Sequence, residues 1–501
     1  MNLPVVPNVI AGGMSGTAGP DPLLVHNPAT GEAIAQVAAA TADEAEAAIQ
    51  AADQAFRSWS EVSLGRRAAV LFKLRELLAG SADELAAIVS REQGKVISDA
   101  KGEVARGLEV VDFACGIPQL LKGEYSPQVA SGVDVASWRE PLGVTVGVTP
   151  FNFPVMVPLW MSPVAIATGN AFILKPSPLD PSASVKLAEL WRRAGLPDGV
   201  FQVLHGGPDV VGRLLTHPLV KAVSFVGSTP VARQIHVTAV GAGKRVQALG
   251  GAKNHAIVLA DSDAEFAADS VVAAAFGAAG QRCMALSVAL VQESVADEFI
   301  ARVVDKAKAM TVSVGTDPAV DMGPMVSARA RDRAEEIIGA AAAAGAKVAL
   351  DGRGSRPAGF ERGFFTGPTV LDAVQPSMSA YTEEIFGPVL AVVRIKDLDE
   401  GIDLINANPY GNGTALFTAS GAAARRFERR VQVGMIGINV PIPVPVGFHS
   451  FGGWKDSLIG DFHIYGPEGV AFYTQAKVAT RRWPEPSQRP EASFNFGDRT
   501  T

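Results

Sequence analysis

Residues 144–148, VTVGV, are the first of several short runs in this part of the chain that contain β-branched residues. Similar runs follow at 172–176 (FILKP), 201–206 (FQVLHG) and 222–228 (AVSFVGS). Between them lie helical or loop segments such as SASVKLAELWRRAG at 182–195. Buried runs that alternate with helices predict a parallel sheet with crossover connections.

Upstream, TADEAEAAIQAADQAFRSW (41–59) is predicted to be a helix, because Thr41 and Glu44 have capping-box spacing and apolar residues share one face. A second helical block is predicted from Gly65 to about Gly94. Past Gly251 the alternation of strands and helices begins again, which predicts a second α/β domain with a boundary near Gly250. Its strand-like runs are AIVLAD (256–261), VALVQES (288–294), LAVVRI (390–395), GTALFT (413–418) and GMIGIN (434–439). A further strand-like run is expected from Gly469, ahead of a polar tail.

Composition excludes several classes of protein. The 501 residues are 48% hydrophobic and 19% charged, which is typical of a folded protein of two or three domains. The net charge of −7 and the lack of a long basic run argue against nucleic acid as a partner. The start, MNLPVVPNVIAGG, lacks a basic region, and no apolar stretch approaches the roughly 20 residues of a membrane span. We therefore expect a cytoplasmic protein without a membrane anchor.

Known nucleotide and metal motifs are also missing. The chain has no G-x-x-x-x-G-K-[ST], H-E-x-x-H or G-x-S-x-G motif. HGGPDVVG (205–212) only loosely resembles a dinucleotide fingerprint and is interpreted as a strand-to-helix turn. The histidines have no ligand-like spacing and the two cysteines cannot form a disulfide framework, so no metal site is expected.

One of the two cysteines is a candidate nucleophile. Cys283 follows Arg282 in FGAAGQRCMALS (276–287), where a helical segment gives way to a strand. A nucleophile needs thiolate character, partial exposure and a donor for the oxyanion that it creates. Taken alone, a cysteine is more often a small buried hydrophobe. That second interpretation is preferred for Cys115, whose helical setting is apolar.

Four other stretches favour the catalytic interpretation of Cys283. Together with the cysteine segment, in this order and at these separations, they resemble the NAD(P)-dependent aldehyde dehydrogenase superfamily over nearly the whole chain. They are TPFNFPVMVPLW (149–160), ILKPSP (173–178), SFVGSTP (224–230) and EEIFGPV (383–389).

A narrower resemblance is to the CoA-acylating, methylmalonate-semialdehyde dehydrogenase branch. That branch oxidises methylmalonate or malonate semialdehyde to propionyl-CoA or acetyl-CoA with loss of carbon dioxide. The stretches that carry it are GQRCMALS (280–287), RVQALGGAKNH (245–255), PFNFPVMVPLWM (150–161), PIPVPV (441–446) and FYTQAK (472–477).

The resemblance implies an α/β fold of two doubly wound parallel-sheet domains and a small β element for oligomerisation. The NAD-binding domain would comprise 1–122 and 145–250, and the catalytic domain 251–440. The β element and C-terminal tail would comprise 123–144 and 470–501. A homo-oligomer, dimer or tetramer, is expected.

The resemblance also assigns roles at the reacting centre. Cys283 would attack the aldehyde carbon, and the side-chain amide of Asn152 with the backbone N–H of Cys283 would stabilise the alkoxide. One such donor is typically worth about 3 kcal/mol of barrier. The alternative for Asn152 is a turn residue that caps the loop between Phe151 and Pro154.

NAD is the implied hydride acceptor. Each implied contact has a plain structural alternative: a surface lysine, a helix N-cap or a solvated carboxylate. Many relatives have a glutamate where this chain has Pro178, which leaves the preference between NAD and NADP open. The implied contacts are Lys175 (adenosine ribose), Gly227 and Ser228 (pyrophosphate), Glu384 with Phe386 (nicotinamide ribose), and Thr149 and Phe151 through backbone groups.

The fate of the acyl group depends on the stretch ALGGAK (248–253). Hydrolytic relatives have ELGGK, whose glutamate activates water. Alignment on Lys253 puts Leu249 at the glutamate position, and alignment on the paired glycines puts Ala248 there. Neither can take a proton, and no Asp or Glu occurs from Val210 to Ala260. Since general-base assistance is typically worth about 10²–10⁴-fold, the thioester should hydrolyse slowly and await the thiol of coenzyme A.

A semialdehyde that carries a carboxylate needs cationic partners. Arg282 and Arg106 are the candidates, because arginine binds carboxylates bidentately. The alternative for Arg106 is a helix ion pair with Glu103 or Glu109. Phe153 and Phe448 are expected as apolar walls of the aldehyde tunnel, although either could be plain core.

Two competing interpretations remain. A hydrolytic aldehyde dehydrogenase would give steady turnover without coenzyme A. A structural protein that has kept the fold would give no burst of NADH, and it fits poorly with the intact set Cys283, Asn152, Lys175 and Glu384.

Overall fold

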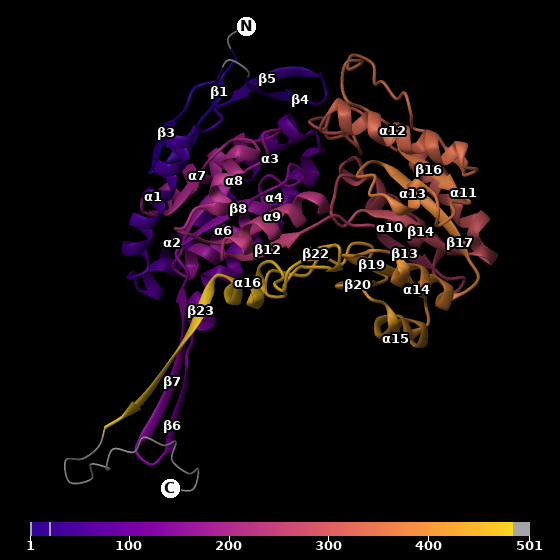
Figure 1. The fold of residues 1–501 in the computed structure, drawn as a ribbon. Helices are drawn as coiled ribbons and strands as arrows, with labels where there is room; N and C mark the ends of the chain where they lie inside the picture. The colour runs from indigo at the N-terminus through magenta and orange to yellow at the C-terminus, as the bar shows by residue number, and fades with distance from the viewer. Residues whose placement is uncertain (1–2, 20–21, 484–501) are drawn as a thin grey trace.

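The computed structural model describes residues 3–19 and 22–483 and contains two α/β bodies side by side (Figure 1). A three-stranded β arm extends away from the first body. This arrangement confirms the predicted α/β class, with two mainly parallel sheets that also have antiparallel edge strands.

The first body is built on an eight-stranded sheet in the order β22-β12-β11-β8-β9-β10-β2-β3. All four quoted runs are strands in it, and β8 and β9 are buried at every position. The chain order reverses between β8 and β11, so this is a doubly wound sheet whose switch point lies between them. The parallel strands are β8 (Val144–Val148), β9 (Ala171–Lys175), β10 (Phe201–Val203), β11 (Val220–Val226) and β12 (Arg245–Leu249). The antiparallel edges are β2 (Asn8–Ile10), β3 (Gly13–Ser15) and β22 (Leu458–Ile459).

The helices of this body include the predicted N-terminal one. It begins after Thr41, whose hydroxyl accepts from the Glu44 N–H while the Glu44 carboxylate accepts from the Thr41 N–H, so the capping box is confirmed. The single helical block expected from Gly65 is two helices, because Ser81 leaves helical geometry. The helices are α1 (Ala42–Trp59), α2 (Leu64–Gly80), α3 (Ala82–Gln93), α4 (Ile97–Cys115), α5 (Ile117–Leu120), α6 (Met156–Ala167), α7 (Ser182–Arg193), α8 (Pro208–Thr216) and α9 (Thr229–Gly241). A small separate sheet holds β1 (Val5–Val6), β4 (Leu23–Asn27) and β5 (Glu32–Val37).

The second body contains a seven-stranded sheet in the order β15-β16-β17-β14-β13-β19-β20. Its strands are β13 (Asn254–Val258), β14 (Leu286–Gln292), β15 (Lys347–Leu350), β16 (Thr369–Asp372), β17 (Val389–Ile395), β19 (Gly413–Phe417) and β20 (Met435–Ile438), of which β15 is antiparallel. Its helices are α10 (Ala264–Phe276), the 3₁₀ turn η1 (Gly277–Gly280), α11 (Glu293–Ala309), α12 (Ala328–Ala343), α13 (Ser379–Thr382), α14 (Leu398–Ala407) and α15 (Gly421–Arg430).

The arm consists of β6 (Glu124–Ala130), β7 (Val133–Pro141) and β23 (Thr474–Arg482). The strand expected from Gly469 begins later, because Gly469–Phe472 belong to α16 (Gly466–Phe472), which has a proline in its first turn. The remainder of the predicted C-terminal element, 484–501, lies outside the described residues. In the described part of the chain, no helix is long and apolar enough to cross a membrane.

The two sheets are joined directly at the point where the site forms. Residues 250–253 lead from the carboxyl end of β12 to the amino end of β13. After β20 the chain returns through the very short strand β21 (Trp454–Lys455), which pairs with β18 (Tyr410–Gly411), and then joins the first sheet as β22. The carboxyl ends of the first sheet, where ligands bind in doubly wound folds, therefore face the amino ends of the second.

Candidate active site

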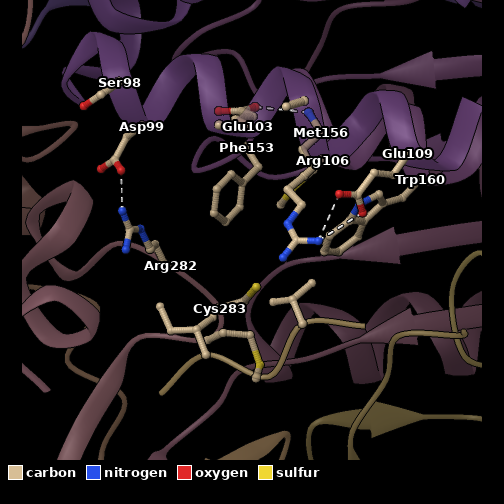
Figure 2. A pocket seen from close by; sticks show the side chains of 15 residues that line it. Ser98, Asp99, Glu103, Arg106, Glu109, Phe153, Met156, Trp160, Arg282 and Cys283 are labelled. Atoms are coloured by element: carbon tan, nitrogen blue, oxygen red, sulfur yellow. Dashed lines mark hydrogen bonds and ion pairs between the residues drawn. The ribbon is translucent and has the colours of Figure 1, made fainter. Parts of the chain in front are cut away.

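Cys283 lies where three hollows meet, just ahead of β14. The largest is a cavity of about 450 Å³ that also has Arg106, Arg282 and Trp160 in its wall (Figure 2). A smaller hollow joins Cys283 to Asn152, and another joins it to Glu384 and Phe386. Cys115, by contrast, packs in the apolar core. Cys283 thus borders the candidate substrate cavity, the candidate oxyanion donor Asn152 and the candidate cofactor residues Glu384 and Phe386.

The backbone before Cys283 follows an unusual course. Ala278, Ala279 and Gly280 all have positive φ, between 50° and 69°, a region that alanine seldom adopts. Such local strain persists only where surrounding structure holds it. Here the side-chain amides of Asn254 and Asn412 donate to the Cys283 carbonyl at 2.8 and 3.0 Å.

Asn254 and Asn412 were not identified from the sequence. Asn254 stands at the first position of β13, the neighbour of β14, and Asn412 immediately precedes β19, the next strand of the sheet. A polar amide at the buried start of a strand is the signal that could have revealed them.

The environment of Cys283 favours the protonated form of its side chain. Burial, together with the nearby Glu384 carboxylate, raises the pKa of the Cys283 thiol to about 12, against the opposing effects of two backbone N–H groups and Arg282. Burial likewise raises the pKa of Cys115, to about 11. Since the pKa values of both cysteines are raised, position rather than acidity distinguishes Cys283 from Cys115.

Asn152 lies in the loop between β8 and α6 and is 4% exposed. The backbone carbonyl of Asn152 accepts a hydrogen bond of 2.6 Å from Lys95, and Glu103 in turn pairs with Lys95. The Glu103 carboxylate also accepts from the N–H groups of Val155 and Met156, where α6 begins. Lys95 was not considered from the sequence, and Glu103 only as a partner for Arg106.

The predicted cofactor residues gather at the carboxyl ends of β8, β9 and β11 and in the loop before β17. Phe151 and Phe386 meet edge to face at 5.8 Å. Lys175 is buried rather than a surface lysine, and burial lowers its pKa to about 8. Ser228 is exposed at the N-cap of α9, but its side chain makes no capping bond. Glu384 accepts from the Ala252 N–H at 2.8 Å, and burial raises its pKa to about 7.

The fit to a dinucleotide can be tested on unsatisfied polar groups. The Thr149 hydroxyl is buried without a hydrogen-bond partner in the described structure. The Lys175 ammonium has one long contact, 3.5 Å to the Gly206 carbonyl. Two such groups at the carboxyl edge of the sheet fit a ligand rich in hydroxyl and phosphate oxygens. The residues present are therefore compatible with NAD.

The two alignments of ALGGAK can now be distinguished. Leu249 lines the hollow that holds Asn152 and Cys283. Ala248 packs in a separate core cluster on the other face of β12. Leu249, and not Ala248, therefore shares a hollow with Cys283, and its side chain has no proton acceptor.

Both candidate arginines line the large cavity, and both already have a carboxylate partner (Figure 2). Arg282 donates to Asp99 at 2.6 Å. Arg106 donates to both oxygens of Glu109 at 3.1 and 3.0 Å, so the alternative of an i,i+3 pair is present, whereas Glu103 is taken by Lys95. Arginine has five N–H donors, so a pair of this kind leaves donors for a second carboxylate.

The expected aromatic walls differ in outcome. Phe153 lines the cavity and also packs against the core. Phe448 is 62% exposed and is not among the residues that line the cavity. Its segment contributes Ile442 and Val444 instead, whereas Phe448 lies in the following turn, which the His449 N–H closes on the Val446 carbonyl.

Comparison with known proteins gives a consistent picture. The model of the aldehyde dehydrogenase family matches residues 16–479. A malonate-semialdehyde dehydrogenase of Pseudomonas aeruginosa is 50% identical over 94% of this chain and 95% of its own length. A Drosophila pseudoobscura protein, named as an acylating methylmalonate-semialdehyde/malonate-semialdehyde dehydrogenase, is 49% identical over 92% of this chain and 88% of its own. A Sinorhizobium meliloti structure assigned as methylmalonate-semialdehyde dehydrogenase, complexed with NAD, has a TM-score of 0.95 and 45% identity, covering 96% of this chain and 99% of its own.

Proposed function

Since this chain belongs to the aldehyde dehydrogenase family, we propose that it oxidises malonate or methylmalonate semialdehyde with NAD and transfers the acyl group to coenzyme A. Carbon dioxide leaves, and acetyl-CoA or propionyl-CoA is the product. The observation that carries the proposal is the joint wall of the large cavity, in which the Cys283 thiol and the two arginines face the same space. The names of the similar proteins support the same substrate class.

The first step is addition of the Cys283 sulfur to the aldehyde carbon. Because the resting thiol is protonated, its proton must leave as the sulfur attacks. The alkoxide that forms would be held by the Asn152 amide and the Cys283 N–H. Return of the alkoxide electrons to form the carbonyl expels hydride and leaves a thioester on Cys283. NAD, when bound along Lys175, Glu384 and Phe386, supplies the hydride acceptor.

The second step is removal of the acyl group by a thiol. At Leu249 no base is available to activate water, so hydrolysis lacks general-base assistance. Coenzyme A brings its own nucleophile, and attack of its sulfur on the thioester carbonyl returns the Cys283 thiol. The word acylating in the name of the Drosophila relative supports this step.

Substrate selection is proposed to depend on Arg282 and Arg106. Each would bind the carboxylate of the semialdehyde while it keeps its own partner, Asp99 or Glu109. An arginine–carboxylate hydrogen bond contributes about 1.5–3 kcal/mol, enough to separate a semialdehyde from an uncharged aldehyde of the same length.

The decisive experiment is NADH formation measured with and without coenzyme A, with mass spectrometry of the product. We expect a burst near one NADH per active site without coenzyme A, and steady turnover to acetyl-CoA or propionyl-CoA with it. Full steady turnover to a free acid without coenzyme A would favour a hydrolytic enzyme. Absence of a burst would favour a structural protein. Cys283→Ala, with NAD binding retained, is the matched control.

A homo-oligomer and a cytoplasmic location are parts of the same proposal. The arm supports the first, because β6 is exposed along its whole length and β23 along most of it. An exposed strand at the edge of a sheet is a template for pairing with another chain. Analytical ultracentrifugation of the chain with and without residues 123–143 would test this.

A further inference from the structure

The loop that carries Asn152 is tied to β9 at its start, where the Thr149 N–H donates to the Lys175 carbonyl at 3.1 Å. It runs from Thr149 to Val155, between β8 and α6, and the N-cap position of α6 has no side-chain capping bond. An oxyanion donor must nevertheless be held to within a fraction of an ångström, since misplacement by about 1 Å can cost a hundredfold in rate. Further anchors, nearer to Asn152 itself, come from another element.

They come from Lys95 and Glu103, before and within α4. The side chains form an ion pair of 2.7 Å and are at most 1% exposed. The Lys95 ammonium also donates to the Asn152 carbonyl at 2.6 Å and lies 4.3 Å from the centre of the Phe153 ring. The other oxygen of Glu103 accepts from the N–H groups of Val155 and Met156 at 2.7 and 3.1 Å. Figure 2 shows Glu103 reaching the start of α6 above Phe153.

These contacts hold both sides of one short segment. The cation fixes the plane of the peptide that leaves Asn152, and the anion fixes the N–H groups three and four residues later. The direction of the Asn152 side chain follows from the first of these peptide planes. Phe153, which lines the substrate cavity, lies between the two anchored points.

We propose that Lys95 and Glu103 are positioning residues that aim the Asn152 amide at the alkoxide. The inference rests on the proposed role of Asn152 in oxyanion stabilisation. Neither residue needs to touch the substrate for this role. The pair acts through backbone groups of the loop, and its complete burial keeps water from competing for those groups.

The test replaces the pair without leaving a buried charge alone, because removal of one partner of a buried pair is strongly destabilising whereas replacement of both is often tolerated. The variant is Lys95→Met with Glu103→Gln. Gln keeps an acceptor for the Val155 and Met156 N–H groups, and Met fills the space of Lys95 but cannot donate. Arg394→Met with Asp372→Asn, a pair in the second body, is the matched control.

The measurements are the rate of the NADH burst with propanal, the Kd of NAD and the melting temperature. We expect a burst slowed by about 10–100-fold, with Kd within twofold and an unchanged rate in the control pair. Asn152→Ala should cost much less in this background than in the parent chain, since the donor is already misplaced. This loss of additivity is what a purely structural role would not produce.

The outcomes distinguish a failure of the oxyanion role of Asn152 from a failure of the positioning role of Lys95 and Glu103. If Asn152→Ala leaves the burst of the parent chain unchanged, the proposed oxyanion role fails. If Asn152→Ala slows the burst but the pair replacement does not, or the two effects multiply, the positioning role fails. Should the double replacement have no cooperative melting transition, Glu103→Gln alone decides: we expect a loss of about threefold to tenfold, again non-additive with Asn152→Ala, and an unchanged rate would overturn the proposal.

Discussion

Gly277 offers a way to move Arg282 without replacing it. The guanidinium packs on the Cα of Gly277, and a Cβ added there would lie 2.5–2.6 Å from its Nη1, Cζ and Nη2 atoms. Ordinary contact needs about 3.5 Å or more, so Gly277→Ala must displace the guanidinium by roughly 1 Å. The backbone of Gly277, with φ −53° and ψ 138°, suits alanine, and a flexible side chain can move aside. The fold should therefore be retained.

The expected consequence is a loss of carboxylate recognition. A displaced Arg282 would weaken its hydrogen bonds to Asp99 and to the substrate carboxylate, at about 1.5–3 kcal/mol for a charged contact. That is a fall of about 10–150-fold in kcat/KM for malonate semialdehyde. Propanal, which has no carboxylate, should lose less than about threefold.

The assay is NADH formation with both aldehydes at saturating NAD and coenzyme A. Gly212→Ala in α8 is the control, because no atom lies within 4 Å of its added Cβ. Arg282→Met gives the maximum loss of kcat/KM for malonate semialdehyde. Adding Gly277→Ala to Arg282→Met should lower kcat/KM little further. Equal losses on the two aldehydes, or no loss on the semialdehyde, would refute the carboxylate role of Arg282.

Three further predictions concern the chemistry of the site. Because burial raises the pKa of Cys283 to about 12, its alkylation by iodoacetamide should speed up about tenfold per pH unit from pH 7 to 9.5; a plateau below pH 9 would contradict this. Burial also raises the pKa of Glu384 from 4.5 to about 7. Between these pH values the folded state binds a proton that the unfolded state has lost. The contribution of this group to stability is therefore fully present below pH 4.5 and is lost as the pH rises through 7. The melting temperature of Glu384→Gln, relative to that of the parent chain, should therefore rise from pH 5 to pH 8. A difference in melting temperature that stays constant over this range would contradict the prediction. Leu249→Glu should raise steady turnover without coenzyme A by about tenfold or more, while Leu249→Gln, of similar size but without a base, should not; equal rates in the two variants would exclude a base at this position.

The strands around the site were predictable because their signal is local. A run such as VTVGV at 144–148 is buried on both faces and has no charged residue, which suits a central parallel strand. The capping box at Thr41 is equally local, since both of its bonds join residues three apart. The prediction of a strand from Gly469 was wrong, because a short apolar segment is compatible with a helix or a strand, and Pro467 favours the start of a helix here.

The candidate site was only partly predictable. Cys283, Asn152, Lys175 and Glu384 belong to motifs with recognisable neighbours, so the sequence identified them as a set. Asp99, Lys95 and Asn412 carry no such motif, and each acts on a residue far away in the chain. Phe448 failed as a tunnel wall because its exposure depends on the course of a loop.

The sequence by itself determined the alternation of strands and helices, the candidate nucleophile and the absence of an acidic residue at ALGGAK, since these depend on residue type and short-range order. Only the tertiary structure decided that Leu249 rather than Ala248 faces Cys283, that both arginines are already paired, and that a buried lysine and glutamate hold the Asn152 loop. The physical reason is that side-chain direction, burial and ion pairing are set by elements that meet across the two sheets. Contacts such as Arg282 to Asp99 join residues 183 positions apart, and no local pattern specifies them.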